Sequence, residues 1–568
     1  MLKKLLPAAI LALLCWYDGS ACTNVIVTPG ASPDSSSMVS YAADSHWLYG
    51  ELYSSPARRF GKGAVRSVTE WDSFMPLGEI PQVARTYRTM GNMNERQLII
   101  GETTWGGREE LMDPDGKIDY GSLIYIALER SSSAREAIKI IVQLANACGY
   151  HSEGESFSIA DPSEAWVMDL IGKGEGNKGI VWVARRIPDG YICAHANQCR
   201  ITRFPLDDPE NCLYAPDVIS FAREKGWFSG KDSEFSFREA YCPLDMGTVR
   251  GCDARVWSAF NTLCDGEFRY EQDGETICRP AGDWLRYAMG GDLGGEMPLF
   301  VKPARKLSVK DIADIMRDHF EGTPMDMTLD IGAGGNACPY RWRPMNFEWG
   351  GHTYLNERAI ATQQTGFWFV GQARGSYPDE LGALLWFGCD DAATSYLTPI
   401  YVSSSKVPEC LRPGNGDLLH YSATSQFWIC NRVAQACYKM YNLMAPVARA
   451  AADSFENRMI GEAVPEIDAK VDRILKGHGP FRKFRARRAL TRFSVRTAMD
   501  QFAAWVKLEE LLLVKFIDGN VKAQNEDGSF AASQYDAGTP EGLTQPGYTD
   551  VWKRAVASDP HSETIREK

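Results

Sequence analysis

The sequence predicts a layered α+β fold with a helical region at its C-terminal end. Three observations lead to this prediction: β-prone segments follow the N-terminus, short strands separated by turns recur between about residues 157 and 402, and helical periodicity dominates from about residue 432. Strands and helices that occur in separate runs pack as sheets covered by helices. The 568 residues are 44% hydrophobic and 24% charged, the composition of a globular protein.

Residues 1–21 are predicted to be a secretory signal peptide. Two lysines precede an apolar run over 5–14, and the small residues Gly19 and Ala21 occupy the −3 and −1 positions of a cut before Cys22. A buried N-terminal helix is the alternative. The apolar run is too short to span a bilayer, and no later stretch offers 18 apolar residues, so no transmembrane helix is expected. We expect an exported protein, in the periplasm, at the cell surface or secreted.

A β-hairpin is predicted directly after the signal peptide. Residues 23–28 are β-prone, 29–36 form a turn rich in Gly, Pro, Ser and Asp, and 37–43 form the returning strand. Asp44 then falls at the end of that strand, beside Cys22. If the chain is cut before Cys22, the thiol and the new α-amine belong to one residue, which becomes a nucleophile with its own base.

The remaining elements follow from turn signals and periodicity. A turn over 91–96 leads into the apolar run 98–100 and can hold the Asn94 amide beside the hairpin. A capping box at Ser308 opens one of the predicted helices. The helices are expected over 120–130, 134–147, 248–263, 308–319, 432–459, 465–475 and 487–516. The later strands are expected over 157–160, 165–168, 180–183, 191–194, 366–370 and 384–387.

Charge and metal-ligand patterns exclude some classes of function. A formal net charge of -12 argues against a nucleic-acid partner, and the basic run 482–492 is interpreted as a solvated helix face. Neither a C-x-x-C pair nor an H-E-x-x-H motif accompanies the 15 cysteines and 8 histidines, so no metal and no cofactor are expected. Disulfides such as Cys193–Cys199 or Cys242–Cys252 are conceivable in an exported protein, but their connectivity stays open.

Cys22 has two other interpretations. It could be the lipid-bearing cysteine of a surface lipoprotein that binds a ligand without chemistry, although Gly19 stands where such signals usually have a Leu-like residue. It could also pair with a histidine in a cysteine protease; the candidate histidines are His46, His151 and His195.

Several motifs, taken in their order along the chain, resemble the PepD-like cysteine dipeptidases, which are N-terminal nucleophile (Ntn) hydrolases related to penicillin V acylase and bile salt hydrolase. They are Cys22-Thr23-Asn24, Gly91-Asn92-Met93-Asn94-Glu95, Gly101-Glu102-Thr103-Thr104, Tyr120-Gly121-Ser122-Leu123-Ile124-Tyr125, Gly154-Glu155-Ser156-Phe157, His195-Ala196-Asn197-Gln198 and Trp386-Phe387-Gly388-Cys389-Asp390-Asp391. The resemblance implies a four-layer αββα catalytic domain over 22–440 and hydrolysis of dipeptides or short peptides. Residues 441–568 would then be a helical extension packed on that domain, or an element for assembly of a homo-oligomer.

The resemblance also implies roles for five residues. Cys22 is the nucleophile, Asp44 orients it, Asn94 and Asn197 serve the oxyanion, and Arg255 is a further site residue. One departure stands out: the acylase branch has an arginine three residues before the aspartate, where this chain has a tyrosine at position 41. The alternative activity is that of an Ntn acylase on an N-acyl amino acid or a conjugated bile salt.

Overall fold

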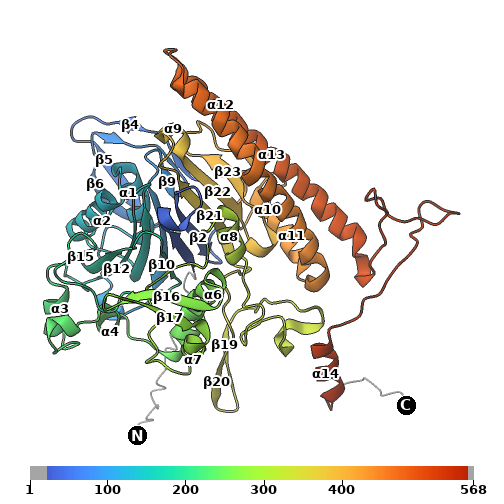
Figure 1. Ribbon diagram of the computed structural model, residues 1–568, viewed down its shortest axis with the longest axis horizontal. Coiled ribbons are helices and arrows are strands. Elements are labelled where there is room, and N and C mark those ends of the chain that lie inside the picture. Colours follow the sequence, from blue (N-terminus) through green and yellow to red (C-terminus); the bar gives the residue numbers. More distant parts are fainter. Residues whose placement is uncertain (1–21, 561–568) are drawn as a thin grey trace, which may run out of the picture.

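Two antiparallel sheets form the centre of the molecule, whose computed structural model describes residues 22–560 (Figure 1). The predicted signal peptide lies outside the described residues. The seven-stranded sheet has the order β18 (Phe300–Val301), β14 (Ile192–His195), β1 (Asn24–Val27), β2 (Ser37–Asp44), β21 (Thr365–Ala373), β22 (Ala383–Cys389) and β23 (Thr398–Tyr401). The eight-stranded sheet has the order β15 (Cys212–Tyr214), β13 (Ile180–Arg186), β12 (Ala165–Gly172), β11 (Gly154–Ala160), β10 (Ile99–Trp105), β9 (Met93–Asn94), β8 (Thr89–Met90) and β3 (Ser54–Ser55).

The two sheets pack against each other through β2 and β21 on one side and β10 and β11 on the other. All residues of β2 and β21 are buried, because other elements cover both faces of their sheet. Two-stranded hairpins decorate the periphery: β4 (Arg58–Arg59) with β7 (Arg85–Thr86), β5 (Val65–Thr69) with β6 (Pro76–Pro81), β16 (Glu267–Gln272) with β17 (Glu275–Pro280), and β19 (Asn346–Trp349) with β20 (His352–Leu355).

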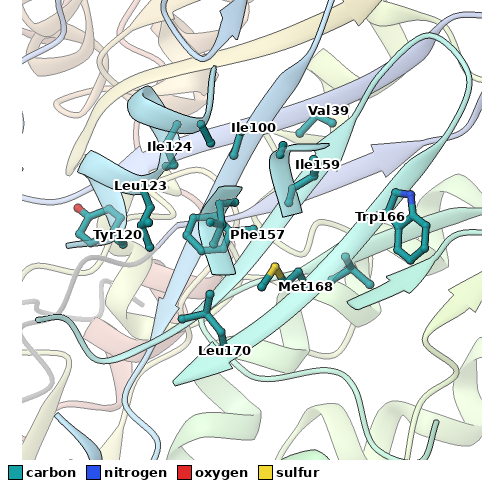
Figure 2. Close-up of a cluster of buried hydrophobic side chains, with 14 of the residues drawn as sticks. Val39, Ile100, Tyr120, Leu123, Ile124, Phe157, Ile159, Trp166, Met168 and Leu170 are labelled. Carbon is teal, nitrogen blue, oxygen red and sulfur yellow. The ribbon is translucent and has the colours of Figure 1, made fainter. Parts of the chain in front are cut away.

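Helices cover the outer face of each sheet. On the eight-stranded sheet lie α1 (Tyr120–Arg130) and α2 (Ala134–Cys148), whose N-caps are Asp119 and Ser133. Figure 2 shows Leu123 and Ile124 of α1 beside Ile100 of β10 and Phe157 of β11. On the seven-stranded sheet lie α6 (Ala254–Leu263) and α8 (Val309–Ile315). Shorter helices are α3 (Val218–Glu224), α4 (Phe237–Tyr241), α5 (Met246–Thr248), α7 (Leu285–Ala288), α9 (Asp379–Gly382) and α14 (Asp550–Ser558).

Four longer helices stand beside β23 at the edge of the seven-stranded sheet: α10 (Gln426–Cys437), α11 (Tyr441–Arg458), α12 (Val464–Lys476) and α13 (Arg482–Lys515) (Figure 1). Buried polar contacts join them to the rest of the fold. Tyr401 Oη of β23 donates to Asp468 Oδ1 of α12 at 2.5 Å, and Arg317 Nη2 donates to Glu456 Oε1 of α11 at 2.5 Å. None of the helices built from the described residues is long and apolar enough to cross a membrane.

The predicted α+β class is confirmed, and the elements differ from the prediction mainly at their ends. The capping box at Ser308 is present, but α8 ends at Ile315 rather than at residue 319, because the His319 N–H binds the Glu321 carboxylate instead of the Ile315 carbonyl. The helix expected over 432–459 begins at Gln426 and is interrupted before Tyr441. Every cysteine among residues 22–560 is a free thiol, so neither conceivable disulfide is formed.

Candidate active site

Cys22 lies at the head of β1, where the hairpin prediction placed it. In the register of β1 and β2, Ile26 is opposite Val39, and an isolated bridge joins Thr23 to Ala42. This antiparallel pairing brings Cys22 next to Asp44 at the end of the returning strand. The backbone of Asp44 hydrogen-bonds the Cys22 sulfur, and both residues are fully buried.

Arg255 holds the head of β1 in place. Its Nη1 donates to the Cys22 carbonyl at 2.6 Å and to Thr23 Oγ1 at 2.8 Å, while Nη2 donates to Asn197 Oδ1 at 2.9 Å. The arginine is the second residue of α6, and its Nε donates to the Gly251 carbonyl at 2.9 Å, within the π-helical turn that precedes α6. Burial, and then the charge of Arg358, lowers the pKa of Arg255 to about 10, so the guanidinium stays charged at neutral pH.

Asn197 follows β14 and faces the same point from the other side. Its backbone has φ +55°, a left-handed conformation that asparagine adopts more readily than most residues. Its Nδ2 donates to the Thr104 carbonyl at 2.5 Å, while its Oδ1 is held by Arg255. The orientation of the Asn197 amide is therefore fixed from both ends.

Asp44 is paired with Arg358, a residue that was not predicted to belong to the site. Arg358 Nη2 donates to Asp44 Oδ2 at 2.7 Å, and Thr365 Oγ1 donates to Oδ1 at 2.6 Å. Burial raises the pKa of Asp44 to about 6, although the charge of Arg358 acts in the opposite direction. Arg358 sits in an irregular segment before β21, more than 300 positions from Asp44, and nothing in its local sequence indicates a site.

A buried carboxyl group, that of Glu102 on β10, lies beside the sulfur. The Cys22 thiol is 3.5 Å from Glu102 Oε1 and 3.7 Å from Tyr41 Oη, and Tyr41 in turn donates a short hydrogen bond to the same Oε1. Tyr41 occupies the position where the acylases carry arginine, and Glu102 belongs to a motif quoted above for its resemblance alone. Neither residue was predicted to contact Cys22, because the role of Tyr41 becomes visible only once Glu102 is known to lie beside it, and the reverse.

Asn24 and Gly101 fix the position of Glu102 relative to β1. With its amide oriented to satisfy both ends, Asn24 accepts from Glu102 N and donates to Glu102 O, each at 3.0 Å. A Cβ on Gly101 would come within 2.7 Å of the end of the Asn24 side-chain amide, an approach that glycine permits. These hydrogen bonds join β1 of the seven-stranded sheet to β10 of the eight-stranded sheet next to Cys22.

Glu102 shares its environment with a second buried glutamate. Glu155 lies on β11, diagonally across from Glu102 in the β10–β11 register, and the two carboxyls hydrogen-bond each other. Burial raises the pKa of both groups, and the charge of Glu102 raises that of Glu155 further. Two carboxyls in such contact share one proton, and their hydrogen bond lowers the pKa of Glu102 and raises that of Glu155.

The surroundings of Cys22 keep its thiol protonated in this state. Burial raises the pKa of Cys22 well above its ordinary value, and the charges of Glu102 and Asp44 raise it further. A thiol must lose its proton to act as a nucleophile. The site therefore requires a base that lies close to the sulfur.

Histidine does not supply that base from position 195. Thr103 Oγ1 lies 2.7 Å from His195 Nδ1 and Ser158 Oγ lies 2.7 Å from Nε2, so hydroxyl groups occupy both ring nitrogens. Burial lowers the pKa of His195 to about 3, which keeps the imidazole neutral. The hydrogen-bond partners given for the Cys22 sulfur are Tyr41, Glu102 and the backbone of Asp44, which gives no support to a cysteine–histidine pair.

Asn94 does not lie with the other predicted site residues. Its Nδ2 donates to the carbonyls of Leu128 and Ser131 at 2.7 and 2.8 Å, and its Oδ1 accepts from the N–H groups of Arg96 and Leu98. The side chain caps the end of α1 and closes the turn before β10. Both amide hydrogens are used in this way, so the structure shows a structural role for the Asn94 side chain and does not bring it to Cys22.

Among residues 22–560, no group of three or more His, Cys, Asp or Glu side chains is arranged to hold a metal ion. The described site is therefore built from one thiol, carboxyls, a phenol, an amide and two guanidinium groups. This is an inventory for acid–base and nucleophilic chemistry at an acyl group.

Comparison with known proteins points in the same direction. The model of peptidase family C69 matches residues 21–454. A probable dipeptidase of Latilactobacillus sakei is 24% identical over 416 residues, which cover 69% of this chain and 76% of that protein. A probable dipeptidase of Salmonella dublin is 24% identical over 356 residues (57% and 72%), and probable dipeptidase B of Lactococcus lactis is 23% identical over 323 residues (56% and 58%).

Proposed function

Because the chain belongs to peptidase family C69, we propose that it is an exported cysteine dipeptidase whose nucleophile is Cys22, released as the N-terminal residue by a cut after Ala21. One observation carries the proposal: the sulfur lies at the head of β1, with the residue's carbonyl held by Arg255 and Asp44 beside it. Two facing sheets with helices on their outer faces support an αββα N-terminal nucleophile fold for residues 22–440.

The free α-amine of Cys22 is the base in this mechanism. An α-amine titrates at about 7.7 to 8.0, so it is partly unprotonated at neutral pH and accepts the thiol proton. The thiolate then attacks the carbonyl carbon of the substrate's first residue. The ammonium formed on Cys22 gains the neighbouring carboxylate of Asp44, whose own position is fixed by Arg358 and Thr365.

Asn197 is assigned to the oxyanion that forms in this attack. Arg255 and the Thr104 carbonyl orient its amide before substrate arrives, so no reorganisation is needed as charge develops on the carbonyl oxygen. One such donor typically contributes about 3 kcal/mol to the barrier reduction. The tetrahedral intermediate collapses when the Cys22 ammonium returns the proton to the leaving amine, and a thioester remains. Water, deprotonated by the same α-amine, then hydrolyses the thioester and releases the first amino acid.

Export followed by assay of the mature protein tests the proposal. The mass of the mature chain should correspond to residues 22–568, and the protein should hydrolyse dipeptides. Cys22→Ser should lose at least about 10²-fold in kcat/KM, because a hydroxyl is far harder to deprotonate, and Cys22→Ala should lose essentially all activity. The proposal fails if the mature chain begins elsewhere, if Cys22 carries lipid, if only N-acyl amides are cleaved, or if Cys22→Ala stays active.

A further inference from the structure

A cavity with a volume of about 360 Å³ lies at the end of the seven-stranded sheet that is remote from Cys22. The register of β21 places it there: Thr365 pairs with Asp44, and Ala373 lies at the other end, where β21 leads into α9. Both acidic residues of α9 line the cavity, as does Ser403, which follows β23. The nine residues of β21 span roughly 26 Å, so the cavity is separate from the candidate active site.

Positive charge predominates in the lining of this cavity. It holds four cationic side chains and three carboxylates, in a chain whose formal net charge is -12. Arg96 forms an ion pair with Asp379. Lys483 forms an ion pair with Glu380. The third carboxylate, that of Glu95, accepts from a backbone N–H at 3.1 Å, so each carboxylate of the lining already has a donor.

The other two cations, Arg85 and Arg487, have donors to offer. Neither guanidinium makes a hydrogen bond or an ion pair with another of residues 22–560, and the Nε of Arg487 is buried without an acceptor. At longer range the charge of Arg487 acts on Glu380, whose direct partner is Lys483. Arg487 belongs to the basic run 482–492, which was interpreted as a solvated helix face. One arginine of that run therefore lines a cavity.

Two further buried groups at this place lack partners. Ser403 is 5% exposed, and its Oγ has no hydrogen-bond partner in the part of the chain that the structure describes. Arg88 Nη1 donates to the Ser404 carbonyl at 3.3 Å, while the Arg88 Nε is buried without an acceptor among the same residues. Burial lowers the pKa of Arg88, and the charge of Arg487 lowers it further, although Glu95 acts in the opposite direction. A buried hydroxyl beside guanidinium groups with unused donors suits an oxyanion.

We propose that this cavity binds a small molecule through an oxyanion, a phosphate group or a carboxylate, which Arg85, Arg487 and Ser403 hold. Guanidinium groups bind both kinds of oxyanion through parallel N–H donors, and the hydroxyl supplies a further donor. The volume lies at the lower end of the range for small-molecule sites, about 300–1,000 Å³. Because Arg85 belongs to β7 and Arg487 to α13, the bound anion joins the helical region to the rest of the fold.

Calorimetric titration of the purified protein with inorganic phosphate, and separately with acetate, tests the site at constant ionic strength. We expect one saturable site per chain, and the anion that binds more tightly identifies the group that the cavity takes. Arg487→Gln should raise the Kd roughly 10- to 100-fold, because one charged hydrogen bond is lost. Arg488→Gln is the matched control: Arg488 is the next residue of α13, is exposed and does not line the cavity, so the Kd should stay at the wild-type value.

Arg85→Gln and Ser403→Ala keep the test decisive if Arg487→Gln does not fold, and both should raise the Kd in the same direction. The site would be overturned if the wild type bound neither anion saturably, or if Arg488→Gln weakened binding as much as the substitutions in the lining. Binding is measured without turnover, so the result does not depend on the proposed dipeptidase activity.

Discussion

At the scale of single residues, the position of Cys22 depends on an arginine that lies 233 positions away in the sequence. Arg255 donates to the Cys22 carbonyl, to Thr23 and to Asn197, so one guanidinium aligns the proposed nucleophile with its proposed oxyanion donor. The planar fork of arginine makes this triple contact possible, and a lysine ammonium on a flexible stem cannot reproduce it.

Arg255→Lys should therefore lower kcat by about 10²-fold, the usual cost of misplacing a reacting group by about 1 Å, with a smaller change in KM. Arg250→Lys is the matched control, because Arg250 lies one turn earlier and pairs with Glu357 and the Met289 carbonyl. Steady-state kinetics on a dipeptide, together with thermal melting, measures both variants. Equal activity in Arg255→Lys and wild type would contradict the alignment role.

Residues near the hairpin were predictable, and residues that act through distant partners were not. Cys22 and Asp44 follow from strand signals and one tight turn, which fix which residues face each other. Asn94 was ambiguous because an asparagine in a turn suits an oxyanion site and a helix cap equally well, and its side chain caps α1 in the structure. Arg358 and Glu102 gave no local signal, since their significance arises only from partners that the fold brings to them.

At the scale of elements, the contact between β22 and α10 contains a buried carboxyl group, that of Asp390. Asp390 follows β22 in a left-handed conformation with φ +64°; its Oδ1 accepts from Asn431 of α10 at 3.0 Å, and its Oδ2 is buried without a donor. Burial raises the pKa of Asp390 from 3.8 to about 8. A group whose pKa is higher in the folded state stabilises the fold below its unfolded pKa, and this contribution is lost as the pH rises through the folded value.

Asp390→Asn should remove that pH dependence. Asparagine tolerates the left-handed backbone and keeps an acceptor for Asn431, but it does not ionise. Relative to wild type, the variant's melting temperature should rise by several degrees between pH 5 and pH 9, because only the wild type must bury a charge at the higher pH. Asp417→Asn, at an exposed carboxylate, is the control. A constant difference across this pH range would show that Asp390 does not titrate in it.

Element types were easier to predict than element ends. The 3.6-residue periodicity of 120–130 and 134–147 and the short apolar runs of β11 to β14 are strong local signals. The ends of helices depend on tertiary partners. Helix α8 ends before the predicted residue because the His319 N–H donates to the Glu321 carboxylate. Helix α10 begins before the predicted residue because Phe427 and Cys430 are packed into the core.

At the scale of the whole molecule, the C-terminal helices are part of the core and the tail after them is not. Leu490, Trp505 and Leu512 of α13 are buried against the sheet edge and the neighbouring helices. Beyond residue 520 most side chains are exposed, and α14 contacts the rest through η6 (Ile331–Asn336), where Thr549 N donates to the Gly335 carbonyl at 3.0 Å. The two segments should respond differently to truncation.

Deleting 521–568 should shift the melting temperature by only a few degrees and leave dipeptide hydrolysis unchanged. Deleting 482–568 should abolish soluble expression, because each large apolar side chain lost from the core costs about 2 to 5 kcal/mol and several are lost together. Measurements of solubility, thermal melting and dipeptide kinetics distinguish the two truncated proteins. A stable, active chain that ends at 481 would show that α13 is dispensable.

Arg255 donates a hydrogen bond to the carbonyl of Cys22. A cut before Cys22 changes its amine and leaves this carbonyl unchanged. On the proposed mechanism, the uncut chain is thus a latent zymogen with its machinery already assembled. One hydrolysed peptide bond before Cys22 would then free its amine in a site whose hydrogen bonds from Arg255 and from the Asp44 backbone are already present. On the same proposal, in which the cut accompanies export, dipeptide hydrolysis begins only after the enzyme has left the cytoplasm.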